Sequence, residues 1–347
     1  MIQRNFRRFA VLTAAILCIF MLKPTTQTTD AAEMPSTNPM TQKWTGPYGG
    51  VPPFDKIKIA DFKSAVEAAM TENLAEIDAI AKTQAAPTFQ NTIVALERTG
   101  ATLDRVGTIY GIWASNMNSD EFGKIEADLD PKIAAHFDKI IQNDALFKRI
   151  EAVYNSPAKK RLTSEQQRLT WDYYTRFVRS GAKLDAAKKS RLSEINQSLA
   201  KLFTRFSQNL LGDETQKFLL IENEESLAGL PQSLRDASAA AATAKKLPGK
   251  WIIRNTRSSV DPFLTYSDNR QLREKAWRMF INRGDNGDER DTNSTITDIL
   301  KLRAERAKLL GFPTHAHWRL ENTMAKTPER AMELLERVWP AAVARVH

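Results

Sequence analysis

The sequence is poor in the residues that most often hold metals or act as nucleophiles. It has one cysteine and four histidines in 347 residues. The cysteine, Cys18, lies inside an apolar N-terminal segment. If that segment is removed during export, the remaining chain can form no disulfide and has no thiol nucleophile. The motifs G-x-x-x-x-G-K-[ST], G-x-G-x-x-G and G-x-S-x-G are all absent, so the common signatures of nucleotide-binding proteins and serine hydrolases are missing.

The sequence also lacks a concentrated charge of one sign. The formal net charge is +9, spread along the chain, and no aromatic residues are interleaved with the basic runs at 159–161 and 188–189. A modest, dispersed excess of this kind is typical of a soluble protein, so we expect no nucleic-acid partner. The apolar content of 42% and charged content of 26% are those of an ordinary globular protein.

Long apolar runs are missing except at the N-terminus. Residues 1–8 carry three arginines, residues 9–22 are almost entirely apolar, and small residues surround Ala31 and Ala32. This order predicts a signal peptide over about 1–32, with an uncleaved anchor as the alternative. We expect the mature chain to have no stable membrane span. Because an exported chain without cysteines fits a bacterial periplasm, we expect a periplasmic location.

Helical periodicity dominates the rest of the chain. Residues 33–55 are rich in Thr, Pro and Gly, which predicts a linker that becomes ordered near Trp44. We expect residues 56–347 to form one mainly α-helical lobe. Its first apolar stripe recurs at three- and four-residue steps: Phe62, Val66, Met70, Leu74, Ile77 and Ile80. A second long stripe runs from Leu192 to Leu210, before Gly212.

Several residues mark where helices should begin or end. Gly100 and Gly181 are expected stops, and residues 163–166 (Thr-Ser-Glu-Gln) match a capping box. Thr327 is the expected cap of a last helix, with Pro328 at its first position. Between 216 and 267 the pattern changes. The short β-prone runs "KFLLIE" and "KWIIRNT" predict a small strand pair inserted in the helical protein.

The pair His315 and His317 in "THAHW" is the most evident candidate for a metal site. Pro313 and Thr314 precede it and predict the start of a short helix. Two residues apart on a helix, these side chains point about 200° away from each other, so they cannot bind one ion. We therefore expect two partly exposed histidines without a metal. His136 lies on an apolar helical pattern and is expected to be packed and hydrogen-bonded.

An acidic loop is the second candidate. The segment "RGDNGDERDTN" gathers Asp285, Asp288, Glu289 and Asp291 around two glycines. It lacks the D-x-[DN]-x-[DN]-G order and the closing Glu of a calcium-binding loop. A charged turn between two helices explains the pattern better. No catalytic, cofactor-binding or metal-binding residue is therefore assigned in this sequence.

Taken in order, the helical segments resemble the N-terminal part of the thimet-oligopeptidase-like zinc metallopeptidases, and most closely the bacterial peptidyl-dipeptidase branch. The resemblance covers about 46–347 and rests on "APTFQNTIVALERTG", "DPKIAAHFDKIIQNDALFKRIEAVYN", "RLTWDYYTRFVRSGAKL", "RLSEINQSLAKLFTRFSQNLL", "LRAERAKLLGF" and "MAKTPERAMELL". It implies an almost entirely helical lobe beside a channel that admits short unstructured peptides. It also implies a zinc cofactor in the complete enzyme.

The catalytic motif of that family, H-E-x-x-H on a helix, does not occur here, and the sequence contains no His-Glu pair. The final segment "AAVARVH" offers no helix stop. We therefore expect the N-terminal part of an exported oligopeptidase that releases C-terminal dipeptides, truncated before its catalytic region and inactive alone. The alternative is a natural short protein, a non-catalytic periplasmic module that binds peptides or a protein. The sequence does not determine the oligomeric state or the side-chain preference for substrates. It also does not distinguish release of dipeptides from cleavage of internal bonds.

Overall fold

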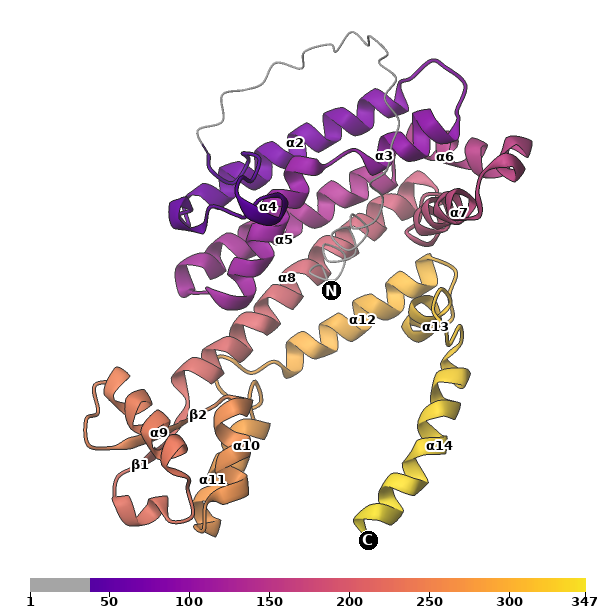
Figure 1. Ribbon diagram of the computed structural model, residues 1–347. Helices are drawn as coiled ribbons and strands as arrows, with labels where there is room; N and C mark the ends of the chain where they lie inside the picture. The colour runs from indigo at the N-terminus through magenta and orange to yellow at the C-terminus, as the bar shows by residue number, and fades with distance from the viewer. Residues whose placement is uncertain (1–37) are drawn as a thin grey trace. The chain divides into compact units, whose positions relative to one another are not determined.

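A computed structural model describes residues 38–347, and these are mainly helical, as expected from the periodicity (Figure 1). The chain divides into two compact units. The first ends at Lys201 and resumes at Leu302, and the second runs from Leu202 to Lys301. The segment expected to be a signal peptide lies outside the described residues. Within residues 38–347, no helix is both long and apolar enough to cross a membrane.

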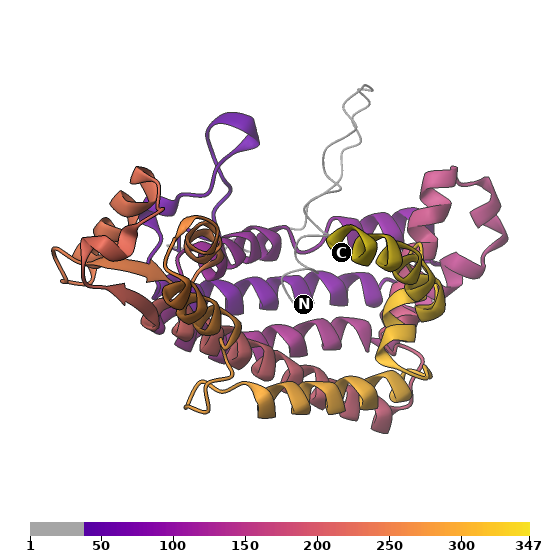
Figure 2. The ribbon, with the colours of Figure 1, turned by 90° about the horizontal axis from the view of Figure 1, so that it is seen from below.

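The first unit contains most of the helices. They are α2 (Asp61–Ala81), α3 (Ala95–Glu97), α4 (Ala101–Asn116), α5 (Asp120–Ile141), α6 (Asp144–Asn155), α7 (Ser164–Arg179), α13 (His315–Leu320) and α14 (Pro328–Val346). Two further helices, α8 (Ala186–Gln216) and α12 (Asn293–Leu309), have one part in each unit. Helix α2 lies side by side with α4 and α5 in both ribbon views (Figures 1 and 2).

The core of the first unit forms because α2 buries the stripe predicted from its sequence. Phe62 is fully buried, and its ring contacts those of Tyr110, Trp113 and Phe122 edge-on at 4.9 to 6.2 Å. Edge-to-face contacts of this kind add to the free energy gained by burying the rings. Met40, in the segment expected to be a linker, is also fully buried in this cluster. The chain is thus packed against the helices from near the first described residue.

The expected helix boundaries follow from local hydrogen bonds. The side chain of Thr163 accepts from the backbone N–H of Gln166, and the Gln166 side chain accepts from the Thr163 N–H, which completes the predicted capping box of α7. Gly100 adopts a left-handed φ of 78° just before α4, a conformation that glycine reaches without strain. Thr327 caps α14, with Pro328 at its first position.

The second unit contains the predicted strand pair. Strand β1 (Phe218–Ile221) pairs antiparallel with β2 (Trp251–Arg254), so that Phe218 lies opposite Arg254 and Ile221 opposite Trp251. Around the sheet lie α9 (Gln232–Ala244), α10 (Arg257–Tyr266) and α11 (Arg270–Ile281). Ala242 on α9 covers one face of the sheet, and Phe263 on α10 and Ala276 on α11 cover the other.

Helix α8 continues past Gly212, where the second apolar stripe was expected to end. It runs to Gln216. Gly212 lies inside the helix, beside the flexible end of the Arg290 side chain, and does not terminate it. The sequence pattern could not separate a glycine inside a helix from one that ends it.

Candidate functional site

The two histidines of "THAHW" lie at the start of α13, as predicted. Thr314 caps this helix, and its hydroxyl lies 2.8 Å from Nδ1 of His317. Nε2 of His317 is 3.8 Å from the carboxylate of Glu329. His315 instead packs against Trp318, with ring centroids 5.5 Å apart. The two imidazoles thus have different neighbours, which agrees with their spacing on a helix.

His136 is packed and hydrogen-bonded, as predicted. Its side chain on α5 is 3% exposed, and Nε2 lies 3.0 Å from Oδ1 of Asn73 on α2. Burial lowers the pKa of the imidazole to about 4, and the nearby ammonium of Lys139 acts in the same direction. His136 is therefore neutral at pH 7 and joins two core helices through a hydrogen bond.

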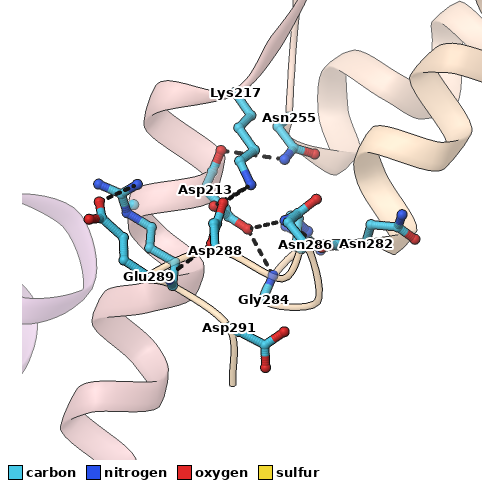
Figure 3. A network of polar contacts seen from close by, with 12 residues as sticks. Asp213, Lys217, Asn255, Asn282, Gly284, Asn286, Asp288, Glu289 and Asp291 are labelled. Carbon is cyan, nitrogen blue, oxygen red and sulfur yellow. Dashed lines mark hydrogen bonds and ion pairs between the residues drawn. The ribbon is translucent and has the colours of Figure 1, made fainter. Parts of the chain in front are cut away.

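The acidic loop between α11 and α12 is held by hydrogen bonds within the second unit (Figure 3). Its anchor is Asp213 on α8, whose side chain is fully buried. Oδ2 of Asp213 accepts from the backbone N–H of Gly284 and from Nδ2 of Asn286, both at 2.8 Å. The Gly284 carbonyl in turn accepts from the backbone and the hydroxyl of Thr292. The loop is thus fixed at both ends.

Lys217 supplies the positive charge of this network. Its ammonium lies 3.2 Å from Oδ1 of Asp213 and 2.6 Å from Oδ2 of Asp288. The bond to Lys217 and a backbone N–H from Arg290 lower the pKa of the Asp288 carboxyl. Oδ1 of Asp291 accepts from the backbone N–H of Asn293 at 2.8 Å. These carboxylates form internal contacts, which agrees with the charged turn predicted from the sequence.

The sequence analysis did not single out Asp213, although it organises the loop. The only local signal is a lysine four residues later, directly after the end of α8, a spacing that brings side chains together on a helix. That pattern is frequent on helix surfaces. Only the chain fold, which brings residue 284 to residue 213, distinguishes this aspartate from an ordinary surface acid.

A second polar cluster joins α7, α12 and α13 in the first unit. Nε1 of Trp318 donates to the backbone carbonyl of Arg179, and the Arg179 side chain forms an ion pair with Glu321. The guanidinium of Arg306 lies 4.6 Å from the centre of the Trp318 ring. Burial and the neighbouring Arg303 lower the pKa of Arg306 to about 10. The indole ring therefore helps to hold a buried cation in place.

Neither cluster fits a zinc ion. Among residues 38–347, no three His, Cys, Asp or Glu side chains come together in a way that could hold a metal. A catalytic zinc site needs three protein donors of these types at about 2 Å, with a fourth position open to water. The described residues do not supply that set.

The similarity to known proteins extends over nearly the whole chain. Residues 263–347 match the model of peptidase family M3. The chain is 34% identical over 311 residues to the dipeptidyl carboxypeptidase of Salmonella typhimurium, an alignment that covers 90% of this chain. The chain is related to the family M3 peptidases. The resemblance inferred from the helical segments is thus confirmed.

Two further relatives show how widely the similarity extends. The dipeptidyl carboxypeptidase of Escherichia coli is 34% identical over 312 residues, again over 90% of this chain. Oligopeptidase A of Haemophilus influenzae is 31% identical over 291 residues, or 83% of this chain. The alignments cover 46%, 46% and 42% of the three relatives, so this chain spans about half their length.

Proposed function

We propose that this chain forms a non-catalytic helical part of an exported metallopeptidase that acts on short unstructured peptides. One observation carries the proposal: the similarity to dipeptidyl carboxypeptidases covers 90% of the chain. The helical fold supports it, because segments that carry the resemblance form helices α6, α7 and α8. Release of C-terminal dipeptides is the activity proposed for the complete enzyme, with zinc as its cofactor.

The role of this part follows from what its residues offer. The described side chains include no zinc donor set. They do form two compact units, one of them with a small sheet. We propose that this scaffold binds and orients a peptide, whereas the zinc ligands come from polypeptide other than residues 38–347. The periplasm remains the proposed location.

The test is a comparison of binding and hydrolysis by the purified chain. We expect a fluorescently labelled hexapeptide with a free C-terminus to bind, as measured by fluorescence anisotropy. We expect no chelator-sensitive cleavage of that peptide by mass spectrometry, and a zinc content far below one equivalent. Hydrolysis that a chelator abolishes would overturn the proposed non-catalytic role.

A folded-protein control separates this proposal from its alternative, a non-catalytic module that binds a protein. A folded protein of similar charge should not bind, because the proposed partner is an unstructured peptide. Binding of a folded protein without any binding of peptides would instead support the non-catalytic protein-binding module.

A further inference from the structure

The outer edge of strand β1 has no strand partner in the part of the chain that the structure describes. β1 and β2 form a two-stranded sheet, so each strand has one neighbour and one outer edge. In an antiparallel strand, alternate residues direct their backbone N–H and C=O groups away from the neighbouring strand. No hydrogen bond other than the β1–β2 ladder is formed by the backbone of residues 218–221 within 38–347. An unpaired edge of this kind can accept an added strand.

Helices cover both faces of the sheet, whereas no strand pairs with the outer edge of β1 within residues 38–347. Leu219 and Ile221 belong to the cluster that contains Phe263 of α10 and Ala276 of α11. Phe218 and Leu220 point the other way, toward Ala242 and the α9 side. The alternation of successive side chains between the two faces explains this division. An incoming segment could therefore pair with the backbone of β1 without displacing the core.

A groove lies where the start of β1 meets α11. Its volume is about 340 Å³, and cavities of this size hold small ligands or a few residues of a peptide. Its lining is formed by Gln216, Lys217, Phe218, Leu219, Lys275 and Met279. Apolar residues, a glutamine and two lysines thus line the same opening as the first residues of the strand.

The two lysines of the groove differ in their partners. The ammonium of Lys217 is neutralised by Asp213 and Asp288, as Figure 3 shows. Lys275 is exposed, and among residues 38–347 it forms no ion pair. Glu274, the acid next to it in sequence, is paired with Arg278 at 2.9 Å. The groove therefore carries one uncompensated positive charge, which complements a carboxylate.

We propose that an extended peptide binds along the outer edge of β1 as a third strand and places a carboxylate on Lys275. This inference rests on the proposed function, because it assigns a place to the peptide that the scaffold binds. The backbone of β1 would supply hydrogen bonds that do not depend on the peptide sequence. Lys275 would favour one end of the peptide, or an acidic side chain, over a neutral group.

The experiment combines a titration with hydrogen exchange on the full chain. Four labelled peptides of the same length are compared: one with a free C-terminus, one amidated, one amidated with a glutamate near its end, and one N-methylated at alternate residues. The N-methyl groups remove donors needed for strand pairing. We expect slower amide exchange within residues 218–221 when the first peptide is bound, and a loss of that protection with the methylated peptide.

The variant Lys275→Gln tests the charge. We expect it to weaken binding of the free-acid peptide about three- to fivefold, the size typical of an exposed ion pair. Amidation should weaken binding to the unaltered chain by a similar factor, and should have no further effect on Lys275→Gln. If the amidated peptide with a glutamate binds as tightly as the free-acid peptide, a side-chain carboxylate is sufficient for the contact with Lys275. Lys301→Gln, an exposed lysine outside the groove, is the matched control and should change nothing.

The outcomes separate this proposal from the proposed function. Peptide binding without protection of residues 218–221, or without any effect of Lys275→Gln, would overturn the edge-strand site while the peptide-binding scaffold would stand. The absence of binding by every peptide would overturn both. Protection of the strand together with the charge effect would establish the site.

Discussion

Helices α2 and α14 both carry a periodic apolar stripe, but only the stripe of α2 is buried in the structure. Along α2, Phe62, Val66 and Ile77 are at most 3% exposed. Along α14, Leu335, Val338 and Trp339 recur at similar steps and are 58% to 70% exposed. No residue of α14 is buried. A periodic apolar stripe thus identifies which face of a helix is apolar, but not whether another element covers it.

The physical difference between the two helices is the presence of neighbours. Helix α2 packs against α4, α5 and α6. The free energy of burying an apolar side chain is gained only when other atoms replace the water around it. The exposed apolar stripe of α14 is therefore a surface that the described residues leave uncovered.

The largest expected effect comes from the centre of the buried stripe. Phe62→Ala should destabilise the first unit by about 3–5 kcal/mol, because it removes a fully buried ring and leaves a cavity among three aromatic side chains. Trp339→Ala, on the exposed stripe, is the matched control and should change stability by less than about 0.5 kcal/mol. Urea unfolding followed by circular dichroism measures both. Equal effects would contradict the distinction drawn between the helices.

A smaller effect is expected from pH, through the contact between α2 and α5. The pKa of His136 is about 4 in the folded chain, against about 6.5 for an unfolded histidine. Above pH 6.5 both states are neutral and this group has no effect. Between pH 6.5 and 4 the unfolded state binds more protons, so the free energy of unfolding should fall as pH falls, by at most about 1.4 kcal/mol per pH unit.

The control for the pH effect is His136→Gln, which keeps a polar side chain beside Asn73 and does not titrate. Denaturant unfolding at pH 7 and pH 5 should show a smaller loss of stability for this variant than for the unaltered chain. An identical loss in both would show that His136 is not responsible.

The smallest effect is expected on α14. Leu335→Glu places a charge at a position that is 60% exposed, so stability should change by less than about 0.5 kcal/mol. The same substitution at Val66, which is 2% exposed, should prevent stable packing because a buried carboxylate without a partner is costly. Thermal unfolding of the two variants makes this comparison. A large loss for Leu335→Glu would mean that the α14 stripe is covered in solution.

Much of the fold could be predicted because its signals are local. The capping box at Thr163 and the left-handed Gly100 each depend on residues a few positions apart, and the two strands at 218–221 and 251–254 are each marked by a short β-prone run. The end of α8 could not be predicted, because a glycine such as Gly212 can either end a helix or lie inside it, and here the helix continues to Gln216. The helical placement of His315 and His317 was predictable from the residues before them.

The candidate sites also combine features that the local sequence predicts with features that depend on residues far apart in the chain. The acidic loop was recognisable as a charged turn from its own sequence. The buried carboxylate that holds it, Asp213, lies 71 residues before Gly284 and has no local pattern that marks it. The groove beside Lys275 is equally hidden, since its lining comes from β1 and from a helix more than 50 residues later.

The sequence by itself determined the helical class and the strand insertion, because these depend on periodicity and capping along the chain, and its ordered segments carry the resemblance to peptidases. Only the tertiary structure decided which stripe is buried, which acid is an anchor and which lysine has no partner. Burial and ion pairing depend on distances between residues that are far apart in sequence. Those distances are set when the helices pack.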